Sequence, residues 1–131
     1  MSEPGPPPID LERVICRVTE LAAQGARAFT MGRGDWPLRG FAVMTPGGAR
    51  AYVNRCPHAG HPLDLVPGRF LTADGSLLLC ASHGALFEKS TGLCVAGPCP
   101  GRALTPLAVR VDSGLVLLAE EVELRAPDGG A

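Results

Sequence analysis

The sequence predicts an all-β domain in which two loops carry the unusual chemistry. With 131 residues the chain is long enough for one domain. It contains 17 Gly and 13 Pro, and so many residues that end regular structure favour short strands and loops over a helical bundle. Several segments alternate between apolar and polar residues, as half-buried strands do, and no long segment shows helical periodicity.

The expected strands follow one another with short turns between them. A P-G-G sequence joins two of them and predicts a hairpin, because glycine adopts the positive φ that tight turns need. Residues 55–68 and 97–102 are expected to be loops, and Glu20–Gly25 could form one helical turn. The strands are predicted at Glu12–Thr19, Ala26–Met31, Arg39–Thr45, Ala49–Asn54, Ser76–Cys80, Ala85–Glu88, Leu104–Val111 and Leu115–Ala119.

Charge and hydropathy exclude several classes of protein. The formal charge is −1 without a basic stripe, so the sequence predicts no nucleic-acid partner. The longest apolar run, around Leu77–Leu79, is far shorter than a membrane span, and the acidic, Pro-rich start is unlike a secretory signal. We therefore expect a soluble, cytoplasmic protein without a membrane partner. Residues 1–8 are predicted to be a disordered arm, 9–120 the folded domain and 121–131 a flexible tail.

Two Cys and two His stand in close pairs. Cys56 and His58 form a C-x-H pair, and after 21 residues Cys80 and His83 form a C-x-x-H pair. Thiolate and imidazole are ligands that iron and zinc accept. Zinc fingers usually pair Cys with Cys and His with His, whereas iron–sulfur centres with mixed ligands use two of each. The spacing favours iron–sulfur over a structural zinc site, which stays open as the alternative.

The motifs around these pairs resemble the Rieske iron–sulfur domain over residues 10–119. They are C-P-H-A-G-H-P-L, C-A-S-H-G-A-L-F-E, the following S-T-G-L-C and a late P-L-A-V-R-V. The resemblance implies a sandwich of three antiparallel sheets, with a two-loop cluster-binding subdomain at about residues 55–68 and 80–101. It implies one 2Fe–2S cluster per chain, with Cys56 and Cys80 on the inner iron and His58 and His83 on the outer iron. The stretch G-R-F-L-T-A-D-G is expected to be an extended loop.

The residues around the ligands predict a low reduction potential. High-potential members of the family carry a further Cys in each loop, and these form a disulfide; the matching positions here are His61 and Ser82. Those members also place Ser and Tyr hydroxyls against the cluster, where this chain has Ala85 and Phe87. Fewer hydrogen bonds to the sulfurs stabilise the reduced state less. We therefore expect a potential near the low end of the range of about −150 to +300 mV for Rieske centres.

Three further residues are expected near the cluster. Gly84 lets the backbone approach the cluster or is a simple turn glycine. Pro98 in G-P-C-P resembles the family's proline loop that covers the cluster. His61 is expected to be a loop residue at the rim, and a role in tuning the potential by protonation stays open.

The remaining cysteines and the tryptophan have simpler interpretations. Cys94 and Cys99 are close enough in sequence to bridge, but a reducing cytosol favours reduced, partly buried thiols. Cys16 lies in an alternating strand and is expected in the core. Trp36 either contacts a partner or anchors its own loop on the sandwich.

The resemblance implies a soluble one-electron carrier of the ferredoxin type. Such a carrier takes electrons from a reductase and passes them to a terminal oxygenase or another oxidoreductase. Oxygenase catalytic subunits add an iron held by two His and a carboxylate, but this chain has 3 His, two of which are expected cluster ligands. No substrate chemistry of its own is therefore expected. The alternatives are a small redox subunit of a nitrite-reductase-like complex and a non-redox, zinc-binding interaction module.

Overall fold

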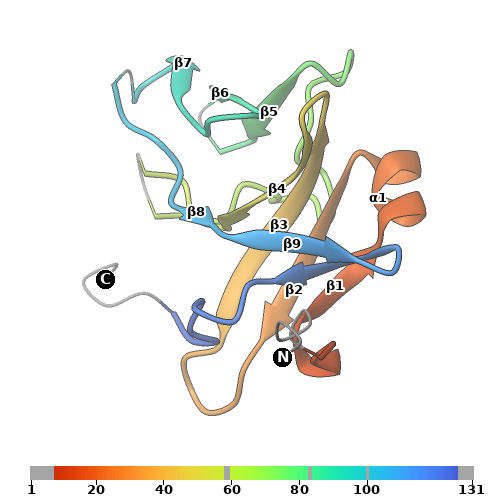
Figure 1. Ribbon diagram of the computed structural model, residues 1–131. Helices are drawn as coiled ribbons and strands as arrows, with labels where there is room; N and C mark the ends of the chain where they lie inside the picture. Colours follow the sequence, from red (N-terminus) through yellow and green to blue (C-terminus); the bar gives the residue numbers. More distant parts are fainter. Residues whose placement is uncertain (1–7, 58–59, 83, 100, 127–131) are drawn as a thin grey trace.

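Three antiparallel β-sheets make up the protein (Figure 1). The computed structural model describes residues 8–57, 60–82, 84–99 and 101–126. The outer sheet has the order β1–β10–β9, the central sheet β2–β3–β4–β8 and the end sheet β5–β6–β7. This confirms the predicted all-β architecture of three sheets. The strands are β1 (Val14–Arg17), β2 (Ala26–Met31), β3 (Leu38–Thr45), β4 (Gly48–Val53), β5 (Leu77–Cys80), β6 (Ala85–Glu88), β7 (Cys94–Ala96), β8 (Pro106–Leu107), β9 (Val109–Asp112) and β10 (Leu115–Leu118).

The central sheet has a hydrophobic core on each face. Successive residues of a strand point to opposite faces. Accordingly Phe41 and Val43 of β3 pack into one core with residues of the end sheet, whereas Ala42 between them packs into the other core with residues of the outer sheet. Strand β4 alternates in the same way, with Tyr52 in the first core and Val53 in the second. Figure 1 shows the end sheet as a separate unit at one end of the molecule.

The predicted P-G-G hairpin joins β3 to β4. Thr45 pairs with Gly48, so two residues form the turn. The Thr45 hydroxyl donates to the Gly48 carbonyl at 2.7 Å and accepts from the Gly47 N–H at 3.2 Å. These bonds satisfy a side chain that is buried at the end of the strand, which fixes the register of the hairpin.

The expected strand at Glu12–Thr19 is too long at both ends. A 3₁₀ turn, η1 (Leu11–Arg13), precedes β1, and helix α1 (Val18–Gln24) follows it. The helix begins at Val18 because the Glu20 carboxylate accepts the Arg17 N–H at 3.0 Å and satisfies a backbone donor at the helix start. The one turn expected at Glu20–Gly25 is therefore a helix of seven residues.

The expected strand at Leu104–Val111 is divided between two sheets. Strand β8 pairs with β4 in the central sheet, and β9 pairs with β10 in the outer sheet. The chain crosses from one sheet to the other at Ala108. Pro106 has no N–H to donate, and it lies in β8 at the edge of the central sheet, where strand prolines are tolerated.

The expected extended loop at residues 68–75 is partly ordered against β5. Leu71 forms a bridge with Leu78, and the Leu79 N–H donates to the Phe70 carbonyl at 2.8 Å. The Phe70 ring stacks on Phe41 of the central sheet at a centroid distance of 4.5 Å. This loop therefore adds buried apolar surface to the core that contains the end sheet.

The ends of the predicted domain are described only in part. Residues 1–7 of the expected arm and 127–131 of the expected tail lie outside the described residues. Within the tail region, the Arg13 guanidinium donates to the Val122 carbonyl at 2.8 Å, and the Ala126 N–H donates to the Trp36 carbonyl at 2.8 Å. Over the described part of the chain, no helix has both the length and the hydropathy that crossing a membrane requires. The domain boundaries stay predictions.

Candidate metal centre

Cys56 and Cys80 lie in the same core from two different loops. Cys56 follows β4 of the central sheet, and Cys80 ends β5 of the end sheet. Both side chains are almost fully buried, and both belong to the core that joins these two sheets. The other expected ligands, His58 and His83, lie outside the described residues. The structure therefore brings together the two thiols of the predicted ligand set and leaves the two imidazoles as a prediction.

The two cysteines begin turns of the same form. The Gly60 N–H donates to the Cys56 carbonyl at 2.8 Å, and the Gly84 N–H donates to the Cys80 carbonyl at 2.9 Å. Both glycines have a φ of +73°, a conformation that side chains with a Cβ adopt only with strain. Of the two interpretations of Gly84, the structure supports the turn glycine, and its approach to a cluster stays a prediction.

Direct hydrogen bonds join the two loops. The Nδ1 atom of His61 lies 3.0 Å from the Ser82 hydroxyl, and the Ala81 N–H donates to the Leu63 carbonyl at 3.3 Å. The Cys56 N–H donates to the His61 carbonyl at 2.7 Å, so a backbone hydrogen bond connects His61 directly to Cys56, one of the expected ligands. His61 and Ser82 stand where high-potential members of the family carry the two cysteines of the disulfide. In this chain the two side chains face each other and form a hydrogen bond instead.

Asn54 and Asp64 brace the first loop, which the sequence analysis did not anticipate. Asn54 Oδ1 accepts the Leu63 N–H at 2.9 Å, and Asn54 Nδ2 donates to Asp64 Oδ1 at 2.8 Å. Asp64 Oδ2 in turn accepts the Gly68 N–H at 3.1 Å. The only available signal was an Asn directly after a strand and an Asp within the loop, residues that often bond to nearby backbone.

A third loop, after β7, packs against both cysteine loops. A Cβ at Gly97 would lie 2.7 Å from Ala85 Cα, so the backbone there approaches the second loop closely. The Arg102 guanidinium donates to the Pro57 carbonyl at 3.0 Å in the first loop. Pro98 is exposed in this third loop, and its expected position over a cluster stays a prediction.

Cys94 and Cys99 bring two more sulfurs to the same core. Both are free, buried thiols, with the Cys99 thiol donating to Cys94 Sγ at 2.9 Å. Burial first, then the hydrogen bond to Cys94 and the negative potential of Cys94, Cys56 and Cys80, together raise the pKa of Cys99 to about 12. Four of the five cysteines therefore share one core, and the fifth, Cys16, lies in the other core as expected.

The positions expected to determine the potential are apolar and buried. Ala85 and Phe87 have no solvent exposure and belong to the core that contains both cysteines. Neither offers a hydroxyl to a sulfur.

The Trp36 side chain is 76% exposed, so it does not anchor its loop on the sandwich. A partner contact remains the other interpretation.

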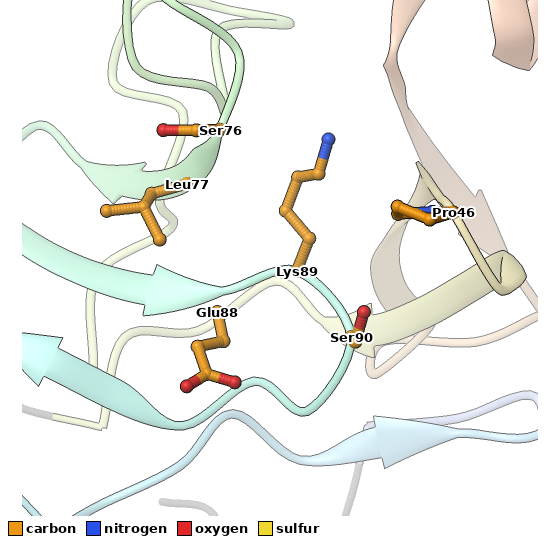
Figure 2. Close-up of a pocket in the computed structure, with 6 residues that line it drawn as sticks. All are labelled: Pro46, Ser76, Leu77, Glu88, Lys89 and Ser90. Atoms are coloured by element: carbon orange, nitrogen blue, oxygen red, sulfur yellow. The ribbon is translucent and has the colours of Figure 1, made fainter.

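A surface hollow lies away from this centre. It has a volume of about 390 Å³ and is lined by Pro46, Ser76, Leu77, Glu88, Lys89 and Ser90. Figure 2 shows the Lys89 side chain extending across it. Leu77 pairs with Glu88, whereas Cys80 pairs with Ala85, so the hollow and Cys80 lie at opposite ends of one hairpin. The hollow is therefore separate from the candidate metal centre.

The chemistry of the two described cysteines, Cys56 and Cys80, fits a 2Fe–2S cluster. Iron–sulfur clusters take Cys thiolates, and a Rieske centre takes two of them and two His. Cys56 and Cys80 supply two thiols on similarly formed turns, in an apolar core that keeps water from the sulfurs. The hydrogen bond between His61 and Ser82 holds together the two loops that carry these cysteines.

Comparisons with known structures agree with this fold. The chain matches the ferredoxin of carbazole 1,9a-dioxygenase from Nocardioides aromaticivorans IC177 with 25% identity and a TM-score of 0.63, covering 82% of this chain and 94% of that one. A cyanobacterial plasma membrane Rieske protein from Synechocystis PCC 6803 matches with 21% identity and a TM-score of 0.63, covering 81% and 97%. A complex of reduced oxygenase and oxidised ferredoxin in carbazole 1,9a-dioxygenase contains a chain that matches with 23% identity and a TM-score of 0.64, covering 86% and 95%.

The family follows from the sequence itself. No curated protein sequence matches the chain. The model of the Rieske [2Fe-2S] domain, however, matches residues 12–119, which include both loops and all three sheets. The chain therefore belongs to the Rieske [2Fe-2S] domain family, and its cofactor is a Rieske-type 2Fe–2S cluster.

Proposed function

We propose that the protein is a one-electron carrier whose cluster is held by Cys56, His58, Cys80 and His83. The two cysteines would bind one iron and the two histidines the other. When bound, the cluster supplies a one-electron couple. The protein holds the two loops together, keeps water from the cysteine sulfurs and sets the potential. The observation that carries the proposal is the burial of Cys56 and Cys80 in one core on matching turns.

The proposed partners are a reductase as donor and a terminal oxygenase as acceptor. The similarity to a ferredoxin of a dioxygenase, and to a chain in a ferredoxin–oxygenase complex, supports the choice of an oxygenase as acceptor. With two of the 3 His assigned to the cluster, His61 alone is left for any second iron site. Docking is expected to be weak, with an interface below about 1,200 Å², because a carrier must leave its partner after each transfer.

The proposed potential lies near the low end of the range of about −150 to +300 mV for Rieske centres. The buried, apolar side chains of Ala85 and Phe87 support this value, because they give the sulfurs no hydroxyl donor. Replacing them in the variants Ala85→Ser and Phe87→Tyr should raise the midpoint potential. Direct electrochemistry on loaded protein measures the shift, and an unchanged potential in both variants would argue against this account.

Absorption and EPR spectra of anaerobically purified protein test the cluster assignment. A red-brown protein that gives a rhombic signal after dithionite, with an average g below the free-electron value, is expected. Cys56→Ser and Cys80→Ser should lose the signal, while Cys16→Ser, a buried cysteine in the other core, should keep it. A colourless protein with stoichiometric zinc would contradict the proposal and leave a structural metal domain.

Electron carriage is tested separately by stopped-flow mixing. Loaded protein, reduced and freed of dithionite, is mixed with an oxidised Rieske-type oxygenase, and the visible spectrum of the carrier reports its reoxidation. A rate that rises with oxygenase concentration is expected. Intact cluster without any transfer to the oxygenase would remove that class of acceptor from the proposal.

A further inference from the structure

Cys94 and Cys99 form a sulfur pair that the candidate metal centre does not use. The Cys99 thiol donates to Cys94 Sγ at 2.9 Å, and the Cys94 thiol donates to the Ala96 carbonyl at 3.3 Å. The two side chains therefore point at each other. A disulfide has an S–S distance of about 2.05 Å, so a small rotation of either side chain brings the sulfurs to bonding distance.

The backbone around the pair is suited to closing this small ring. Cys94 opens β7, a strand of three residues at the edge of the end sheet, and Cys99 lies in the loop after it. The Cys94 N–H donates to the Arg102 carbonyl at 2.8 Å, and the Arg102 N–H donates to the Cys99 carbonyl at 3.1 Å. Because both cysteines bond through their backbone to Arg102, their positions relative to each other are fixed before any disulfide forms.

Burial limits which reagents reach the pair. Cys94 is 4% exposed and Cys99 2% exposed, while Leu93 and Val95 on either side of Cys94 are exposed. A short edge strand has few hydrogen bonds to break, so local opening at β7 is the route by which Cys94 becomes accessible. Opening of β7 would expose Cys94, which begins this strand, with Cys99 beside it.

We propose that Cys94 and Cys99 are a redox-active pair that a low-molecular-weight disulfide such as oxidised glutathione converts reversibly into an intramolecular disulfide. Cys94 attacks a sulfur of the glutathione disulfide, which forms a mixed disulfide and releases one glutathione thiol. Cys99 then attacks Cys94 Sγ and releases the second. The pair gives up two electrons and two protons, and one glutathione disulfide becomes two glutathione thiols. A disulfide between residues this close in sequence stabilises the folded protein less than a disulfide that closes a long loop. The oxidised form is therefore not strongly favoured, and the reaction stays reversible.

The segment that contains the pair packs against both cysteine loops of the candidate metal centre. Between the two cysteines, Gly97 packs on Ala85 directly after the second cysteine loop, and Arg102 just beyond Cys99 bonds to Pro57 in the first loop. The proposed two-electron thiol site therefore lies in a segment that contacts both loops of the candidate metal centre. Its sulfurs are outside the ligand set, so this proposal does not require the electron-carrier proposal to hold.

The test is equilibration of loaded protein in glutathione buffers of increasing oxidised fraction. Samples are quenched in acid, alkylated under denaturing conditions and mapped by mass spectrometry, while visible absorbance of the same samples reports the cluster. The expected result is loss of alkylation at Cys94 and Cys99 together, with recovery after dithiothreitol and no change in absorbance. Alkylation at Cys16, a buried cysteine without another cysteine in its core, should stay complete.

Variants make the assignment specific. Cys94→Ser and Cys99→Ser should each leave the other cysteine fully alkylated or joined to glutathione, and Cys16→Ser should form the bridge as the wild type does. Full alkylation of both cysteines at every buffer composition, with the cluster intact, would overturn the proposal, and so would a bridge from either cysteine to Cys56 or Cys80. A protein that carries zinc and yet forms the bridge would refute electron carriage and support the redox-active pair.

Discussion

The Nδ1 atom of His61 lies 3.0 Å from the hydroxyl of Ser82, and this hydrogen bond links the tips of the two cysteine loops. Ser82→Ala removes the link and should speed the loss of the cluster. One exposed hydrogen bond contributes about 0.5 kcal/mol, which corresponds to release about twofold faster. Decay of visible absorbance in the presence of an iron chelator measures the rate. Ser82→Thr, which keeps the hydroxyl, should behave as the wild type, as should Ser90→Ala at the far end of the hairpin. Equal decay in Ser82→Ala would show that the bond does not hold the loops.

A pair of glycine variants separates backbone strain from a steric clash. Gly97 and Gly68 both have positive φ, at +96° and +82°. A Cβ at Gly68 would meet no atom within 4 Å, whereas one at Gly97 would lie 2.7 Å from the Cα of Ala85. Gly68→Ala should cost about 1 to 2 kcal/mol through conformation alone. Gly97→Ala should cost about 1 to 3 kcal/mol more because backbone must move. Urea unfolding measures both, and equal costs would show that the third loop packs loosely.

The Asn54 side chain should be needed for the stability of the first loop. Asn54→Ala leaves the Leu63 N–H without its acceptor and Asp64 Oδ1 without its donor, which should cost about 1 to 3 kcal/mol in urea unfolding. Asn54→Asp keeps the acceptor for Leu63 but places a second carboxylate against Asp64. Like charges at this distance oppose ionisation, so the stability lost in Asn54→Asp should recover as the pH is lowered and one carboxyl group protonates. A loss that is independent of pH would contradict the assigned geometry.

Asp74 should contribute a pH-dependent term to stability. Hydrogen bonds from the Thr72 hydroxyl and from the Ser76 N–H and hydroxyl lower the pKa of Asp74 to about 2 from 3.8. Because the pKa is lower in the folded state, the stabilisation is present above pH 3.8 and is lost as the pH falls toward 2. The wild type should therefore lose more stability than Asp74→Asn between pH 5 and pH 2. Urea unfolding of both proteins across this range gives the difference, in which the effect of acid on the cluster cancels. Parallel curves would show that the carboxylate bonds do not persist in solution.

The sequence predicted those parts of the fold and site that depend on local pattern. Alternation located most strands, and P-G-G located the turn between Thr45 and Gly48. The spacing of Cys56 and Cys80 relative to their histidines indicated one shared site, and the structure places both cysteines in one core.

Features that depend on contacts between distant residues were missed. Strand β7 has three residues, too few for alternation to be visible, and it exists because it pairs with β6. The change of sheet at Ala108 leaves the alternating pattern almost continuous, so only the partners β4 and β10 reveal it. Asn54 acts through Asp64, ten residues further along the chain, and no local pattern predicts that bond.

The alternation along β3 makes the chain intolerant of a shift by one residue. A slip would turn Ala42 into the core that now holds Phe41 and Val43, and would turn these larger side chains into the core that now holds Ala42. One core would then be underpacked and the other overpacked. Most strands of one-sided sheets expose their wrong face to water after such a slip, whereas here both faces are filled. An insertion of one residue in β3 should therefore disrupt the packing beside the cysteine loops together with that of the opposite half of the molecule, whereas an insertion in the turns at its ends leaves both cores in register.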